Sequence, residues 1–179
     1  FPLVLFVFAS LAKISVFALE TGDAAPNFLL PGVDGNNYSL ASFEKSKLLV
    51  VVFTCNHCPT SQAYEDRLIE LSRDYDKDSL SIVAISPNDP LALRKDELGY
   101  SEVGDTLEGM QIRAKRKGFP FPYLYDGSDQ NCSRAYGPRV TPQVFLFNQN
   151  RRLRYSGRID NSVDSRKVYQ RDLRSAIDC

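Results

Sequence analysis

The sequence is poor in the residues that define several common classes of protein. It contains no tryptophan, one methionine, one histidine (His57) and four cysteines among 179 residues. So few cysteines exclude a disulfide-stabilised scaffold, and a single histidine excludes a metal site built from several histidines. The formal net charge is zero, so the basic field typical of nucleic-acid binding is missing and we expect no nucleic-acid partner. What remains is a globular domain long enough to bury a substantial core.

A long uninterrupted apolar run is also absent. Residues 1–19 are almost wholly apolar, but Lys13 interrupts them before the ~18 apolar residues of a membrane span accumulate. Val16 and Ala18 have side chains that a signal peptidase accepts, so we predict a signal peptide over residues 1–18. Export would place the domain, residues 19–179, in the periplasm or cell envelope or outside the cell. An N-terminal membrane anchor and an ordinary buried helix remain alternatives.

Both ends of the sequence look incomplete. Phe1 is not an initiator methionine, and no basic segment precedes the apolar run. At the other end, the helical pattern of Tyr169, Leu173, Ala176 and Ile177 continues to the terminus without a capping residue. We therefore expect the natural chain to extend beyond both ends.

The stretch Cys55-Asn56-His57-Cys58 is the strongest chemical signal. The apolar residues 48–53 before it predict a buried strand, and Pro59 after it is typical of the first turn of a helix. A Cys-x-x-Cys pair between a strand and a helix is typical of a pair that cycles between dithiol and disulfide.

The spacing suggests a role for each residue of this stretch. A helix N-terminus favours a thiolate, so we expect Cys55 to be the nucleophile, with His57 adding positive charge or a hydrogen bond. Cys58, one turn further on, is expected to be more buried and to resolve the mixed disulfide. Haem attachment is excluded because Pro59 stands where the motif needs histidine, and zinc normally needs a second ligand pair. We predict no cofactor other than the redox-active disulfide itself, and no metal.

The rest of the chain alternates between strand and helix patterns. We predict strands at 80–85 and 123–125, a hairpin of 144–147 with 153–156, and helices at 106–117 and 129–136, the latter capped by Ser128 or Asp129. This order predicts an α/β fold with the sheet between helices. Thr141-Pro142 precedes a predicted strand, where a trans proline is the ordinary case.

Several segments together resemble the thioredoxin superfamily, and within it the peroxiredoxin-like redoxin (AhpC/TSA-like) branch. The resemblance covers residues 20–178 and rests on a series of segments in a fixed order: GDAAPNF, VVVFTCNHCP with AYEDRL, SPNDP, KGFPFPYLYD, SRAYGPRVTPQVFLF and RRLRYSGRID. It implies a thioredoxin-like fold with a mixed central sheet flanked by helices and an insertion at 86–121. It also implies that Pro142 is cis and faces the cysteines, and that Thr54, Asn56, Thr141 and Pro142 contact the substrate.

The chain departs from the two best-known patterns of that superfamily. Thr54 occupies the position of the thioredoxin tryptophan, and Leu49 occupies that of its buried acid, so the proton of the resolving cysteine needs another acceptor. The Pro-x-x-x-Thr-x-x-Cys motif of peroxiredoxins is missing. His57 matches the histidine of periplasmic disulfide oxidases, which indicates an oxidising pair.

Three functions remain open. The leading one is a thiol–disulfide oxidoreductase whose partners are protein thiols or disulfides, or a thiol reductant. The second is a thiol-dependent peroxidase, an antioxidant enzyme, with Cys55 attacking peroxide. The third is a non-enzymatic redoxin that binds copper(I) through Cys55, His57 and Cys58, since soft thiolates suit that ion. Cys132 is interpreted as a small packing residue, with a remote resolving cysteine as the alternative.

Overall fold

A five-stranded mixed sheet forms the centre of the computed structural model, which describes residues 18–179. Its strand order is β5-β4-β3-β6-β7, with β3, β4 and β5 parallel and with β6 and β7 antiparallel to their neighbours. The predicted strands and hairpin are confirmed, with these bounds: β3 Leu48–Phe53, β4 Leu80–Ser86, β5 Tyr123–Tyr125, β6 Gln143–Phe147 and β7 Leu153–Gly157.

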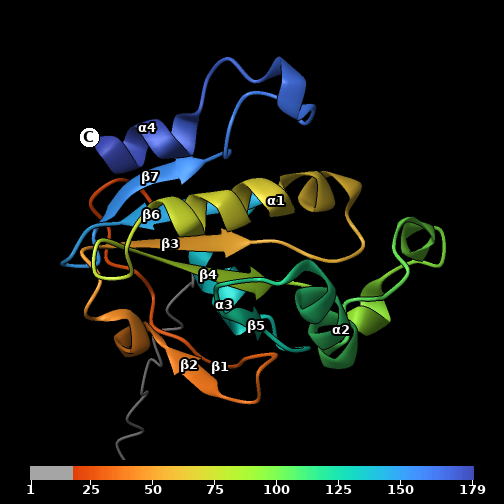
Figure 1. Cartoon of the computed structure of the whole chain (residues 1–179). Helices are drawn as coiled ribbons and strands as arrows, with labels where there is room; N and C mark the ends of the chain where they lie inside the picture. The colour runs from red at the N-terminus through yellow and green to blue at the C-terminus, as the bar shows by residue number, and fades with distance from the viewer. Residues whose placement is uncertain (1–17) are drawn as a thin grey trace, which may run out of the picture.

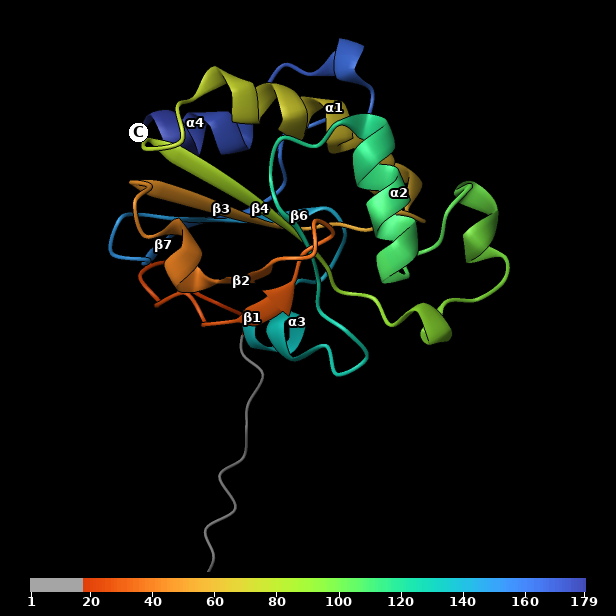
Figure 2. The same cartoon turned by 60° about the horizontal axis from the view of Figure 1, so that its bottom comes forward.

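Helices cover both faces of this sheet. Figures 1 and 2 show α1 (Pro59–Asp74) and α4 (Asp172–Asp178) on one face. The other face carries α3 (Asn131–Tyr136) and the small hairpin of β1 (Leu29–Pro31) and β2 (Asn37–Ser39). Four 3-10 helices also occur among the described residues: Leu40–Phe43, Pro90–Ala92, Glu97–Tyr100 and Ser165–Lys167. The predicted α/β layering is therefore confirmed.

The central strand β3 feeds both hydrophobic layers because successive strand side chains point to opposite faces. Val50 and Val52 join the cluster under α1 and α4, whereas Leu49, Val51 and Phe53 join the cluster under α3 and the small hairpin. All five side chains are inaccessible to solvent. This double burial explains why the strand is a continuous apolar run rather than an alternating pattern.

Residues 86–121, predicted to be an insertion, connect β4 to β5. They include α2 (Leu107–Lys117), which begins at Thr106, whose hydroxyl accepts the Gly109 N–H, and ends at Gly118 in the left-handed conformation. Met110 of α2 is fully buried in the cluster beneath α1. The segment thus contributes Met110 to the core. It also places residues 104–106, which precede α2, beside the loop that follows β3.

Two sequence expectations about helix ends are wrong. Helix α3 begins at Asn131, because Gln130 has a left-handed backbone, and neither Ser128 nor Asp129 caps it. The buried Asp126 carboxylate accepts the N–H groups of Cys132 and Ser133 at 2.9 and 2.7 Å instead. A cap that lies five residues before the helix is not visible as a local pattern.

The C-terminal helix is also shorter than predicted. Tyr169 lies outside α4 and is 87% exposed. Its N–H and that of Gln170 both bind the Asn161 side-chain oxygen, at 3.1 and 2.9 Å, so this stretch is held in a turn. Leu173 and Ile177 do face the core as expected.

The predicted signal peptide lies, apart from Ala18, outside the described residues. Among residues 18–179, no helix is both long enough and apolar enough to cross a membrane.

Replacing Asp126 by alanine should destabilise the protein by about 2 kcal/mol, because two buried N–H groups of α3 would lose their acceptor. Urea unfolding measures this loss. The matched control is Asp129→Ala, an exposed site expected to change the unfolding free energy by less than ~0.5 kcal/mol. Equal losses for both variants would contradict the cap assignment.

Candidate active site

The Cys-x-x-Cys stretch is held between the central strand and the longest helix. Strand β3 ends at Phe53, α1 begins at Pro59, and Cys58 is the N-cap residue of α1. Pro59 fits the first helical position because its missing N–H would have no partner there in any case. The cysteines therefore lie at the carboxyl end of a parallel strand and at the positive end of a 16-residue helix.

A cis-proline loop faces the two sulfurs. The Thr141–Pro142 peptide is cis, as the resemblance implied, and Gln143 after it pairs with Phe53 at the end of β3. The Thr141 hydroxyl lies 3.4 Å from Cys55 Sγ, and its carbonyl oxygen lies 3.5 Å from Cys58 Sγ. The fold thus brings Thr141 to both sulfurs across 86 and 83 residues of chain.

The two cysteines are buried in the opposite order to the one expected. Cys55 is only 2% exposed, whereas Cys58 is partly exposed. The expectation that Cys58 would be the more buried thiol is therefore wrong. The reason is that α1 starts at Pro59 rather than at Cys55, so that Cys58, not Cys55, occupies the helix N-terminus. Both are free thiols in this structure.

The surroundings of the sulfurs favour a thiolate on Cys58. A hydrogen bond from the Cys55 thiol is the largest cause that lowers the pKa of Cys58, and the Ser61 backbone amide in the first turn of α1 acts in the same direction against partial burial. The same hydrogen bond and burial raise the pKa of Cys55, and the negative charge of Asp105 adds to this. These surroundings therefore favour ionisation of Cys58 over ionisation of Cys55.

A buried carboxylate organises the loop between the cysteines. Asp105 is inaccessible to solvent and accepts the backbone N–H groups of Asn56 and His57, at 2.7 and 3.3 Å. It also contacts the His57 ring Nδ1 at 2.5 Å and accepts the Asn88 side-chain amide at 2.8 Å. The His57 ring therefore faces Asp105.

Asn56 is a structural residue of the same loop. It is 1% exposed, its side-chain amide donates to the Gly104 carbonyl at 2.8 Å, and its side-chain oxygen accepts the Tyr123 hydroxyl at 3.2 Å. Thr54 is buried too, and its N–H continues the ladder to Ile85 of β4 at 3.0 Å. Because Thr54 and Asn56 are buried, they are unsuited to contact a substrate. The prediction of substrate contact therefore remains for Thr141 and Pro142.

Sequence reasoning missed Asp105 and Asn88. Asn88 lies in the SPNDP segment, which supported the resemblance but carried no assigned role, and Asp105 lies inside the predicted insertion. An aspartate just before the capping Thr106 is an ordinary local pattern. Only the return of the 86–121 segment to the end of β3 shows that its carboxylate meets the Cys-x-x-Cys loop.

Cys132 fits the packing interpretation. It is buried in the hydrophobic cluster beneath α3, together with Tyr136 and Phe53. Burial raises the pKa of Cys132, and the neighbouring Asp126 charge adds to the effect. A thiol that resists ionisation is a poor redox partner, so these observations favour a structural role.

A metal at this site would have to compete with existing contacts. Candidate ligand atoms of Cys55, His57 and Asp105 lie within 4.8 Å of one another. The Asp105 carboxylate already accepts from two backbone amides, the His57 ring and Asn88. A soft ion such as copper(I) would prefer the two sulfurs, and binding the His57 Nδ1 would break its contact with Asp105.

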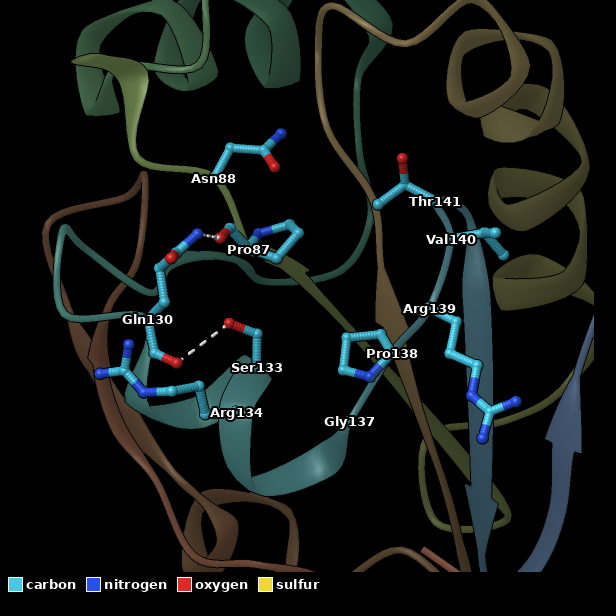
Figure 3. Close-up of a pocket in the computed structure, with 10 residues that line it drawn as sticks. All are labelled: Pro87, Asn88, Gln130, Ser133, Arg134, Gly137, Pro138, Arg139, Val140 and Thr141. Carbon is cyan, nitrogen blue, oxygen red and sulfur yellow. Dashed lines mark hydrogen bonds between the residues drawn. The ribbon is translucent and has the colours of Figure 1, made fainter. Parts of the chain in front are cut away.

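An open pocket of about 480 Å³ is bordered by Thr141, although neither cysteine is among its lining residues. Figure 3 shows Asn88 and Thr141 at one end, Gln130, Ser133 and Arg134 of the α3 region on one side, and the 137–140 segment on the other. Thr141, which contacts both sulfurs, thus also lines the pocket. Arg139 lines this pocket. Arg158 does not line it, and its side chain forms an ion pair with Asp172 at 2.8 Å.

Comparisons with known proteins define the class. The Redoxin family model matches residues 20–173, so the chain belongs to the Redoxin family. It is 38% identical over 129 residues to a Mycobacterium tuberculosis protein named as a candidate peroxiredoxin, covering 71% of this chain and 69% of that one. It is 24% identical over 135 residues to the thiol-disulfide oxidoreductase ResA of Geobacillus thermodenitrificans, covering 74% and 66%.

Solved structures share the fold of this chain. A hypothetical protein from Sinorhizobium meliloti superimposes with a TM-score of 0.78 at 35% identity, covering 90% of this chain and 84% of that one. The five-stranded mixed sheet flanked by helices is the thioredoxin-like fold, as the resemblance implied. Both the family and the fold expected from the sequence are therefore confirmed.

The thiolate of Cys58 should be observable by its ultraviolet absorbance in the reduced protein. We expect it to persist well below the ordinary cysteine pKa of about 8.5, to vanish in Cys58→Ser, and to titrate at higher pH in Cys55→Ala, which lacks the hydrogen-bond donor. The stability that this thiolate adds to the reduced protein is fully present above the unfolded pKa and is lost as the pH falls through the folded one. A low-pH thiolate that survives in Cys58→Ser would contradict the assignment.

Proposed function

We propose that this protein is a thiol–disulfide oxidoreductase in which Cys55 and Cys58 cycle between dithiol and disulfide. One observation carries the proposal. The two cysteines lie between the end of β3 and the N-terminus of α1, and both sulfurs contact Thr141 beside the cis-proline. Membership of the Redoxin family and similarity to a thiol-disulfide oxidoreductase support it.

The geometry supports the reverse of the roles expected from the sequence. The Cys58 thiolate attacks a substrate disulfide R–S–S–R′, forming the Cys58–S–R bond and releasing R′ as a thiolate. Cys55 then loses its proton and attacks Cys58 Sγ, which forms the Cys55–Cys58 disulfide and releases the second thiolate. The substrate gains two electrons and the protein loses two. Oxidation of a dithiol substrate runs through the same steps backwards.

The electrostatics favour the oxidising direction. A stabilised Cys58 thiolate stabilises the dithiol form of the protein, so the disulfide form is the stronger oxidant. His57 was expected to make the cysteine pair oxidising. The main causes that lower the pKa of Cys58 are instead the Cys55 side chain and the first turn of α1. The proposed role is therefore donation of the disulfide to a reduced partner.

The pocket beside Thr141 suits an extended segment of a protein partner. Exposed Val140 and the neighbouring Pro138 provide apolar contact, and Asn88 and Gln130 provide polar contact. Protein thiols and disulfides are therefore the proposed substrates. The apolar residues 1–18 support a proposed location outside the cytoplasm, where disulfides persist.

Single-cysteine variants test both the function and the order of attack. Cys55→Ser and Cys58→Ser should each abolish catalysed insulin reduction. With a model peptide disulfide, Cys55→Ser should accumulate a mixed disulfide on Cys58, detected by mass spectrometry, because its resolving thiol is gone. Cys58→Ser should accumulate none, since Cys55 is buried and protonated. Cys132→Ser, a buried thiol elsewhere in the core, is the control and should behave as wild type.

Two results would contradict these assignments. Turnover retained in both single-cysteine variants would overturn the oxidoreductase proposal. A mixed disulfide that forms on Cys55 in Cys58→Ser as fast as on Cys58 in Cys55→Ser would overturn the order of attack.

Peroxide reduction is a second candidate, favoured by the 38% identity to the protein named as a candidate peroxiredoxin. The sequence suggested Cys55 as the peroxidatic residue, but its burial and raised pKa favour Cys58 instead. The Cys58 thiolate would attack hydrogen peroxide, giving a sulfenic acid and hydroxide, and Cys55 would condense with it to form the disulfide and water.

Stopped-flow mixing with hydrogen peroxide separates the two candidates. A peroxidase should form the sulfenate orders of magnitude faster than free cysteine, in wild type and in Cys55→Ser but not in Cys58→Ser, with trapping by dimedone as the readout. A rate equal to that of free cysteine would reject peroxide as a substrate.

A further inference from the structure

The buried Cys55 thiol has to lose a proton in the second half of the reaction, yet solvent hardly reaches it. It is 2% exposed, and the hydroxyls that contact its sulfur, those of Thr141 at 3.4 Å and Ser61 at 3.9 Å, are not bases. Once Cys58 is held in a mixed disulfide, its sulfur can no longer accept the proton. The thioredoxin-type acid is missing too, since Leu49 stands at that position.

The 86–121 segment places a different carboxylate beside this thiol. Atoms of Cys55, His57 and Asp105 lie within 4.8 Å of one another, and Asp105 contacts the His57 ring at 2.5 Å. Two other buried acids are paired with permanent cations, Glu65 with Arg113 and Asp160 with Arg67. Among residues 18–179, the ion-pair partner of Asp105 is His57, which becomes a cation only by taking up a proton.

We propose that His57 and Asp105 form the proton acceptor of Cys55 during resolution of the mixed disulfide. The inference rests on the proposed function and adds a route by which the Cys55 thiol loses its proton. The Cys55 proton passes to the imidazole, and the Asp105 carboxylate holds the ring and stabilises the imidazolium. The Cys55 sulfur bonds to Cys58 Sγ, the bond from Cys58 to the substrate sulfur breaks, and the substrate leaves as a thiolate.

Side chains from the surrounding elements are consistent with this route. The Tyr123 hydroxyl of β5 faces the loop, and burial raises its pKa, so it stays neutral. On α1, Glu65 is held by Arg113 of α2 at 2.8 and 2.9 Å. The His57 side chain is 17% exposed, which gives the proton a path to solvent after each turnover.

A single-turnover reaction with Ellman's reagent tests the proposal, because each step releases one coloured thiolate. The first release reports attack by Cys58 and the second reports attack by Cys55. In His57→Gln, we expect the first release to stay near the wild-type rate and the second to slow by about 10²-fold, and Asp105→Asn should slow the second release at least as much. The second release should also become steeply dependent on hydroxide, since the Cys55 proton would have to leave to solvent.

The controls separate this role from a structural one and from failure of the proposed function. Asp126→Asn alters another buried aspartate and should leave both phases unchanged. His57→Gln keeps a polar partner for Asp105, so it carries the test if Asp105→Asn fails to fold by near-ultraviolet circular dichroism. A single release in the wild-type protein would overturn the oxidoreductase proposal itself.

Two outcomes would overturn the proton-acceptor inference while leaving the oxidoreductase intact. One is a second phase close to the wild-type rate in His57→Gln. The other is an equal slowing of both phases with an unchanged pH profile, which is what mere distortion of the loop would produce.

Discussion

The burial of one carboxylate imposes the shape of the active-site loop. An unpaired carboxylate in the interior is strongly unfavourable, so the chain around Asp105 has to supply donors. It does so with two backbone N–H groups of the Cys-x-x-Cys stretch, the His57 ring and the Asn88 amide. These contacts hold residues 56 and 57 away from a helical conformation, and α1 starts only at Pro59.

Because α1 starts only at Pro59, the two sulfurs have different environments. Cys58 receives the favourable field of the helix N-terminus and partial access to solvent, whereas Cys55 is buried, which raises its pKa. The cis-proline loop completes the site from the neighbouring strand, with Thr141 in contact with both sulfurs. A Redoxin without the thioredoxin tryptophan, buried acid or peroxiredoxin motif thereby still forms a thiol redox centre.

Much of the fold was predictable because it rests on local patterns. The apolar run of β3, Pro59 at the start of α1, and the polar turn between β6 and β7 each predicted an element that the structure contains. The failures involve partners distant in the fold. Asp126 caps α3 from the preceding turn, and Asn161 holds the backbone of Tyr169 outside α4.

The sequence by itself determined the class of chemistry. Two cysteines at a strand-to-helix junction indicated thiol redox chemistry through their spacing and the periodicity around them, and the ordered family segments implied the thioredoxin-like fold and the cis-proline. Only the tertiary structure decided which sulfur is accessible and which residues surround it. Asp105 meets the loop across 49 residues of chain, and the exposure and pKa of each thiol depend on such long-range contacts rather than on its neighbours in sequence.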